Sequence, residues 1–125
     1  MINELLIFLG AGIGGVFRYW VSNAAFFFLE KHFPYGTLIV NVSGSFLMGF
    51  LFILIQHKFS DLNIQLRALL LIGLLGGYTT FSSFSIETFT LLENGHYLSA
   101  MINIFSSIIL CLVAAWVGVI VGRSV

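Results

Sequence analysis

Long apolar stretches and short polar connectors alternate along the chain. The apolar stretches cover about residues 4–29, 37–56, 66–92 and 98–122. Each is long enough for a membrane-spanning helix, which needs about 20 predominantly apolar residues. The connectors collect Pro34, all three histidines and much of the charge, as water-facing turns do. Because lipid does not tolerate unpaired backbone, the pattern predicts an all-α membrane protein, a single domain over residues 1–125 with four transmembrane helices.

The composition favours lipid as the main solvent of this chain. Hydrophobic residues make up 59% and charged residues 8%, whereas a soluble domain carries about 25% charged residues. The formal net charge is zero without a basic cluster, so we expect no nucleic-acid partner. His32, His57 and His96 lie in different connectors without metal-ligand spacing, and we expect no enzyme. Glu4 stands where a secretory leader carries Lys or Arg, so we expect no cleaved signal peptide.

The distribution of positive charge gives only a weak orientation. With an even number of spans, both ends of the chain and the second connector share one side, which holds Lys58, Arg67 and Arg123. The other side holds Lys31, and also Arg18 if its side chain reaches that interface. This small difference permits insertion both ways under the positive-inside rule. A bundle of four short helices is too thin to enclose a path, and two-fold pairing is the commonest closed assembly, so we expect an antiparallel dual-topology homodimer.

Glycines in the first span admit two interpretations. The letters of residues 10–15 match the dinucleotide fingerprint, but that fingerprint requires a preceding strand and a helix start, and here it lies inside an apolar span. Gly10 and Gly14, four residues apart, instead predict close helix packing. Arg18 continues their face, where a guanidinium is costly unless it is paired or reaches water. It either anchors the span at the interface or supports an anion vestibule or the dimer.

Polar residues form stripes on the second and fourth spans. Thr37, Asn41 and Ser45 share one helix face at spacing four. Asn103 and Ser107 are also four residues apart in the last span. Such groups either bond neighbouring helices together or line a hydrophilic path, for which an amide is a strong uncharged donor.

The third span contains the unusual run GGYTTFSSF at residues 76–84. Gly76 and Gly77, followed by hydroxyl residues, predict a break in the helix at this point. A break in the membrane is tolerated only where protein or a water-filled cavity satisfies the freed backbone. Broken helices build ion sites in transport proteins, where carbonyls coordinate cations and half-helix N-termini face anions.

Two aromatic rings and a carboxylate follow the predicted break. Phe81 and Phe84 share one face, and phenyl edges carry partial positive charge, so the rings could stabilise a small anion without binding it as tightly as an arginine. The alternative is that they are ordinary core aromatics. Ser83 adds a hydroxyl donor nearby. Glu87 is a functional candidate because carboxylates within spans usually have a role, unless it lies at the interface.

Taken together, GAGIGGVFRY, YGTLIVNVSGSFLMG and GGYTTFSSFSIE resemble the Fluc fluoride channels, the CrcB family. The length and the four-span plan match as well. The resemblance implies an antiparallel dual-topology homodimer in the cell's inner membrane, with two fluoride pathways along the subunit interface. It also implies a structural sodium ion at the centre, and passive export of fluoride that reduces its toxicity.

The resemblance also implies roles for single residues. Asn41 corresponds to the pore asparagine, and Gly76 and Thr79 to the carbonyl donors for sodium. Where many members have a tyrosine one turn before the pore serine, this chain has Asn103, so an amide would line the rim of the path. Arg18 matches the family's first-span arginine. The predicted pathway residues are Thr37, Asn41, Ser45, Phe81, Ser83, Phe84, Glu87, Asn103 and Ser107.

Two other hypotheses compete with a fluoride-selective channel. A small multidrug or cation exporter can also be a four-span, dual-topology dimer, but it needs a membrane-embedded carboxylate, typically in the middle of the first span. Here Glu4 lies at the end of that span and its middle is rich in glycine. A membrane scaffold without transport would use every polar stripe only for helix association.

Overall fold

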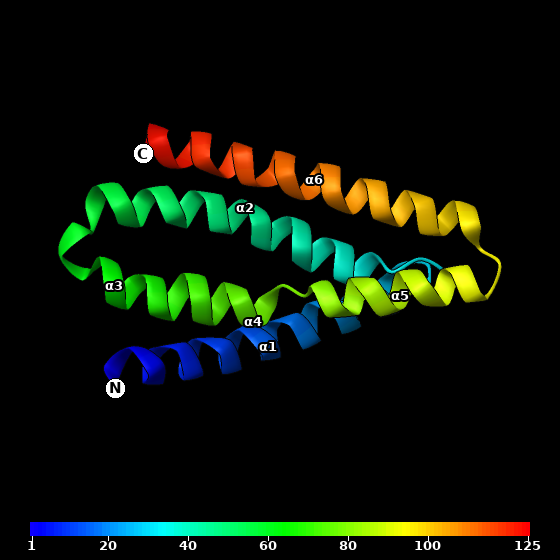
Figure 1. The fold of residues 1–125 in the computed structure, drawn as a ribbon, viewed down its shortest axis with the longest axis horizontal. Coiled ribbons are helices and arrows are strands. Elements are labelled where there is room, and N and C mark those ends of the chain that lie inside the picture. The colour runs from blue at the N-terminus through cyan, green and yellow to red at the C-terminus, as the bar shows by residue number, and fades with distance from the viewer.

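A computed structural model describes residues 1–125 as a bundle of helices without strands. Four segments are long and apolar enough to cross a membrane, which confirms the predicted number of spans. Both chain ends and the connection from α2 to α3 lie at one end of the bundle (Figure 1). The elements are α1 (Ile2–Phe28), α2 (Tyr35–Lys58), the 3-10 turn η1 (Ser60–Leu62), α3 (Asn63–Leu66), the π-helical stretch η2 (Arg67–Leu75), α4 (Gly76–Tyr78), α5 (Phe81–Glu93) and α6 (Tyr97–Ser124).

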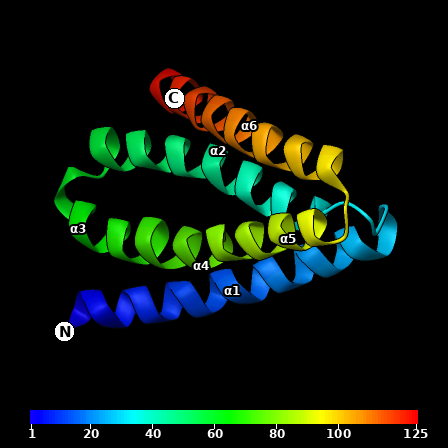
Figure 2. The same ribbon diagram turned by 45° about the vertical axis from the view of Figure 1, so that its right-hand side comes forward.

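The spans pack in a definite order. The helix α2 lies between α6 and the third span, which runs from η1 to α5, and α1 lies on the other side of that span (Figures 1 and 2). The most extensive packing joins α2 to α6 and α1 to η2. The half-helix α5 packs less extensively against the other spans than η2 does.

Glycines set the two closest helix contacts. A side chain at Gly10 would collide with the carbonyl of Leu69 in η2, and one at Gly14 with that of Leu74. This confirms that the Gly10–Gly14 face serves close packing, because small residues let membrane helices approach. Between α2 and α6, Gly118 lies against the carbonyl of Phe46 in the same way.

The turn from α5 to α6 depends on one left-handed glycine. Gly95 has φ +79°, a conformation that glycine adopts without a steric cost. Its N–H donates to the carbonyl of Leu92 at 3.1 Å, and the N–H of His96 donates to that of Leu91 at 2.9 Å. This pair of bonds is the Schellman pattern that closes a helix C-terminus.

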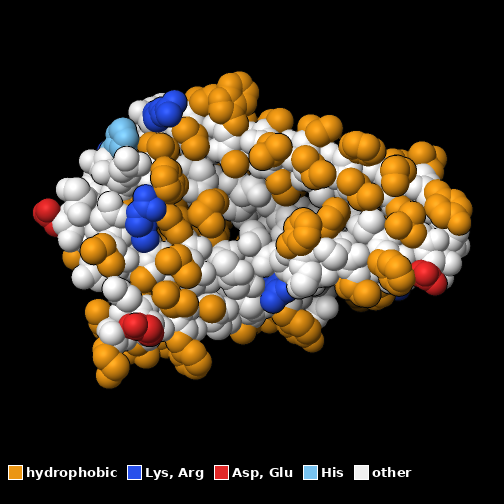
Figure 3. All heavy atoms as spheres, viewed as in Figure 1, with side chains coloured by type: hydrophobic (Ala, Val, Ile, Leu, Met, Phe, Trp, Pro, Cys, Tyr) orange, Lys and Arg blue, Asp and Glu red, His pale blue; other side chains and the backbone are white.

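The surface of the bundle is apolar. Hydrophobic side chains cover its length, and most charged ones lie toward the ends (Figure 3). Phe8 and Leu112, for example, are 74% and 68% exposed. The buried core centres on only three residues, Ile55, Leu71 and Leu75. Together with the four spans, this surface identifies a multi-pass membrane protein.

The third span is interrupted within the predicted stretch, at its hydroxyl residues and not at its glycines. Gly76 and Gly77 remain helical in α4, and the extended residues are Thr79 (φ −85°, ψ 159°) and Thr80 (φ −154°, ψ 118°). Gly77 serves another purpose, because a side chain there would collide with the carbonyl of Ala11 in α1. The interruption comes three residues later, where side chains replace the lost backbone bonds.

Candidate functional site

The break in the third span is held by the side chain of Asn41. Its Nδ2 donates to the carbonyl of Thr80 at 2.9 Å, and its Oδ1 accepts from the N–H of Thr80 at 2.8 Å. In an unbroken helix both groups of Thr80 would pair with residues one turn away. Because orphaned backbone groups are costly when buried and Thr80 is buried, the Asn41 amide stabilises the broken conformation.

The half-helix α5 begins with a hydroxyl cap. Thr80 Oγ1 accepts from the N–H of Ser83 at 3.2 Å and contacts Ser83 Oγ at 3.1 Å. A threonine in extended conformation with such a bond is a typical N-cap. The positive end of the α5 dipole therefore points at the break. The spacing of Thr80 and Ser83 was the sequence signal for this cap, and Thr80 was not among the predicted site residues.

Backbone oxygens are left free on the other side of the break. The N–H of Thr80 pairs with Asn41, so the carbonyl of Gly76 lacks its helical donor. No backbone hydrogen bond spans Thr79–Thr80, and the carbonyl of Thr79 is also without a partner. No cluster of His, Cys, Asp or Glu could hold a metal ion in this chain. Free backbone oxygens of this kind are the donors that unwound membrane helices offer to cations.

A groove of about 450 Å³ runs beside the break. It receives residues from three spans and no charged side chain. The rings of Phe81 and Phe84 lie 5.3 Å apart between centroids at a tilt of 44°. Phe81 is 77% exposed. Five of the predicted pathway residues meet here, namely Asn41, Ser45, Phe81, Phe84 and Ser107.

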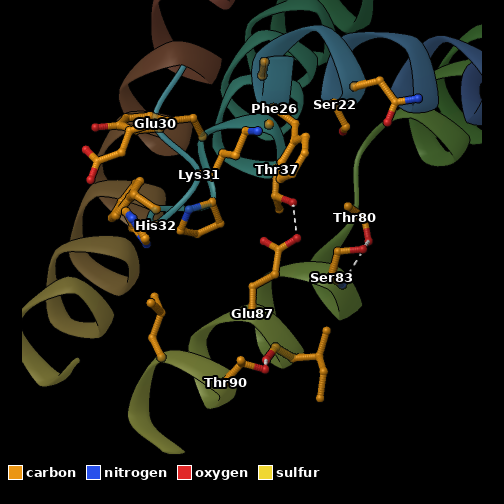
Figure 4. A pocket seen from close by; sticks show the side chains of 18 of the residues that line it. Ser22, Phe26, Glu30, Lys31, His32, Thr37, Thr80, Ser83, Glu87 and Thr90 are labelled. Carbon is orange, nitrogen blue, oxygen red and sulfur yellow. Dashed lines mark hydrogen bonds between the residues drawn. The ribbon is translucent and has the colours of Figure 1, made fainter. Parts of the chain in front are cut away.

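A second, more polar cavity of about 870 Å³ lies among α1, the first connector, α2 and α5. Thr37 and Glu87 project into it from opposite sides (Figure 4), and Thr37 Oγ1 donates to Glu87 Oε1 at 2.8 Å. The other carboxylate oxygen of Glu87 is buried without a partner. Arg18 lines the same cavity, but the only ion pair of the chain joins the N-terminus to Glu4.

The two cavities meet at the break. Thr80 lines both of them. Thr37 and Asn41, predicted to share one stripe, face different cavities: Thr37 the larger and Asn41 the groove. His32 and His96 come from different connectors, yet both line the larger cavity. The sequence could not predict that these two histidines line one cavity, because this depends on how the connectors fold back over the bundle.

Asn103 lies in neither cavity. It is 2% exposed and sits between α5 and α6, where its Nδ2 donates to Thr88 Oγ1 at 2.9 Å. Its Oδ1 accepts from Ser107 Oγ at 3.4 Å. Its expected position at the rim of a path stays a prediction.

Sequence reasoning also missed a bond at the end of α4. The hydroxyl of Tyr78 pairs with Ser43 Oγ at 2.9 Å, which fixes the last residue before the break against α2. A phenol inside an apolar span needs such a partner, and that requirement was the available signal.

The chain is similar to known proteins over almost its whole length. The family model described as "CrcB-like protein, Camphor Resistance (CrcB)" matches residues 5–119. A protein of Coxiella burnetii named fluoride-specific ion channel FluC is 62% identical over 123 residues, 98% of each chain. Proteins with the same name from Methylococcus capsulatus and Magnetococcus marinus are 50% and 47% identical, covering 98% and 92% of this chain and 53% and 93% of theirs.

Proposed function

The chain belongs to the CrcB family, and on that premise we propose that it is a fluoride-selective channel for passive export from the cell across the inner membrane. The relatives named above are fluoride-specific ion channels. The observation that carries the proposal for this chain is the uncharged groove beside the broken third span. Membership of this family makes the chain a transporter and not an enzyme.

The groove has the chemistry that a small, strongly hydrated anion requires. Conduction needs sites that bind well enough for entry and weakly enough for exit. Asn41 keeps one amide hydrogen beyond the one donated to Thr80, and Ser107 and Ser45 bring hydroxyls. Phe81 and Phe84 can present positive ring edges. In the larger cavity, Arg18 attracts anions, and Thr37, Ser83 and Glu87 form the wall.

A second copy of the chain would complete the path. The groove is open to the surface and Phe81 is largely exposed, so a single subunit would present polar groups to acyl chains, which is unfavourable. Lys58, Arg67 and Arg123 on one side against Lys31 on the other give only a weak topological bias. An antiparallel two-fold dimer with a pathway on each side of the interface fits both observations.

A sodium ion at the centre of that dimer fits the free carbonyls of Gly76 and Thr79. Hard cations take oxygen ligands, and unwound membrane helices supply them through backbone carbonyls. When bound, the ion would supply positive charge between the two breaks. In this chain, Asn41 and the Tyr78–Ser43 pair hold the backbone that carries those oxygens.

Ion-selective efflux tests the proposal. The purified protein is reconstituted into vesicles loaded with fluoride or with chloride, and release is followed with ion-selective electrodes. We expect rapid loss of fluoride and retention of chloride. Equal leakage of the two ions, or proton-coupled transport of organic cations as a small multidrug exporter would show, would contradict it. The exporter hypothesis lacks support because Glu4, the carboxylate of the first span, lies at the end of that span and is exposed.

A further inference from the structure

The hydroxyl proton of Ser107 is donated to Asn103, a neighbour that lines neither cavity. Ser107 lines the groove together with Asn41 and Phe84, yet its Oγ donates to Asn103 Oδ1 at 3.4 Å. A serine has one hydroxyl proton to donate. An anion in the groove can therefore take this proton only by breaking the bond to Asn103.

The orientation of the Asn103 amide is fixed by a third residue. Thr88 Oγ1 donates its single proton to the carbonyl of Phe84 at 2.7 Å, so toward Asn103 it can only accept. It accepts from Asn103 Nδ2 at 2.9 Å. A flipped amide would face Thr88 with its oxygen, and neither atom would then have a proton to share. The amide oxygen is thus held toward Ser107.

An anion can readily replace Asn103 as the acceptor of the Ser107 hydroxyl. At 3.4 Å the Ser107–Asn103 bond is longer than the usual range for an O–H···O bond, and a charged acceptor forms stronger hydrogen bonds than a neutral one. Asn103 itself is 2% exposed and lines neither cavity, so an anion in the groove would meet Ser107 and not Asn103.

Resting on the proposed function, we infer that Asn103 is a positioning residue that sets the fluoride affinity of the groove by holding the hydroxyl proton of Ser107. Fluoride displaces the Asn103 oxygen as acceptor of the Ser107 hydroxyl when it binds, and the Ser107–Asn103 hydrogen bond forms again when fluoride leaves. The exchange weakens binding and favours release, which conduction requires. No covalent bond forms or breaks in this step.

The test measures initial fluoride efflux from vesicles across a range of fluoride concentrations. Asn103→Leu removes the competing oxygen, and we expect the half-saturating concentration to fall about two- to tenfold, the worth of one ordinary hydrogen bond. Ser107→Ala should raise it. The double variant should match Ser107→Ala alone, because Asn103 acts only through that hydroxyl. Asn103→Ala, which adds no volume, replaces Asn103→Leu if the larger side chain prevents folding.

Ser106→Ala is the matched control, since Ser106 bonds only to the backbone carbonyl of Asn103, at 3.5 Å, and should leave the half-saturating concentration unchanged. A residue that merely joined α5 to α6 would lower thermal stability without shifting that concentration, or would shift it equally in the Ser107→Ala background. Either result would overturn this inference and leave the proposed function standing. Wild-type vesicles that release no fluoride would instead overturn the proposed function, and this inference with it.

Discussion

The two halves of the third span are held in the bundle by different interactions. The first half, η2 and α4, packs against α1 through glycines that bring backbone to backbone, as at Gly14 and Gly77. The second half, α5, is held by three polar contacts from its neighbours: Asn41 with Thr80, Thr37 with Glu87, and Asn103 with Thr88. Lipid offers no hydrophobic force between helices, so close packing holds most of the first half, with the Tyr78–Ser43 bond at its end, whereas hydrogen bonds hold the second half.

The first half of the span therefore serves mainly the fold, and the second half carries the groups that an ion would meet. The glycine-packed half offers an ion only backbone oxygens at its end, whereas the hydrogen-bonded half carries the rings and hydroxyls of the groove and the larger cavity. Substitutions in the first half should therefore act mainly on folding, and substitutions around the second mainly on flux.

The largest effect is expected from a side chain forced between α1 and η2. Gly14→Leu would collide with the carbonyl of Leu74, and overpacking of this kind costs about 3 kcal/mol or more when backbone must move. We expect little folded protein after detergent extraction, measured by size-exclusion chromatography and thermal unfolding. Gly12→Leu is the control, because nothing lies within 4 Å of a side chain there. Equal recovery of the two variants would show that the packing of this half is not close.

The second largest effect is expected from removing the Asn41 amide, which holds the break through its two hydrogen bonds to Thr80. Asn41→Leu leaves the N–H and the carbonyl of Thr80 unpaired, at about 1–3 kcal/mol for each buried group. We expect fluoride efflux to fall at least tenfold, as a rough estimate from that energy, in protein that still assembles. Gln65→Leu removes an exposed amide without a hydrogen bond and should change nothing. Normal efflux from Asn41→Leu would mean that the broken conformation does not need the two Asn41–Thr80 hydrogen bonds.

A smaller effect is expected in the larger cavity. Thr37→Val removes the only hydrogen bond of the Glu87 carboxylate, a loss of about 1.5–3 kcal/mol for a bond to a charged group. Efflux should slow several-fold, and the melting temperature should fall by a few degrees. Ser85→Ala serves as the comparison, since its hydroxyl bonds only to its own helix, at the carbonyl of Phe81. Equal efflux and equal melting temperatures of the two variants would show that the Thr37–Glu87 bond does not contribute to transport.

The smallest effect is expected at Gly95, at the far end of α5, which itself lines neither cavity. Gly95→Ala forces an alanine into a left-handed conformation (φ +79°), which costs about 1 kcal/mol. The melting temperature should drop slightly while fluoride efflux at saturating concentration stays unchanged. Gly12→Ala, in open space within an ordinary helix, should not lower stability. A large loss of efflux at Gly95 would tie this turn to the conduction path.

The amino-acid sequence determined the number of spans, the polar stripes and the presence of a break near residues 76–84. These features depend on local composition, because the length of an apolar run and the spacing on one helix do not require knowledge of the neighbours. The Gly10–Gly14 face was predictable for the same reason. Residues of the groove could be named because two spans carried polar stripes and the third carried the run of residues 76–84 with its two phenylalanines.

Only the tertiary structure decided which partner each polar group meets. The break falls at Thr79–Thr80 and not at the glycines, because Asn41 of another span supplies the bonds that Thr80 loses. Thr37 and Asn41 share a face but face different cavities, and Asn103 turns inward to Thr88. A hydrogen bond between spans depends on their rotation and depth, which are set by glycine contacts far away in the sequence.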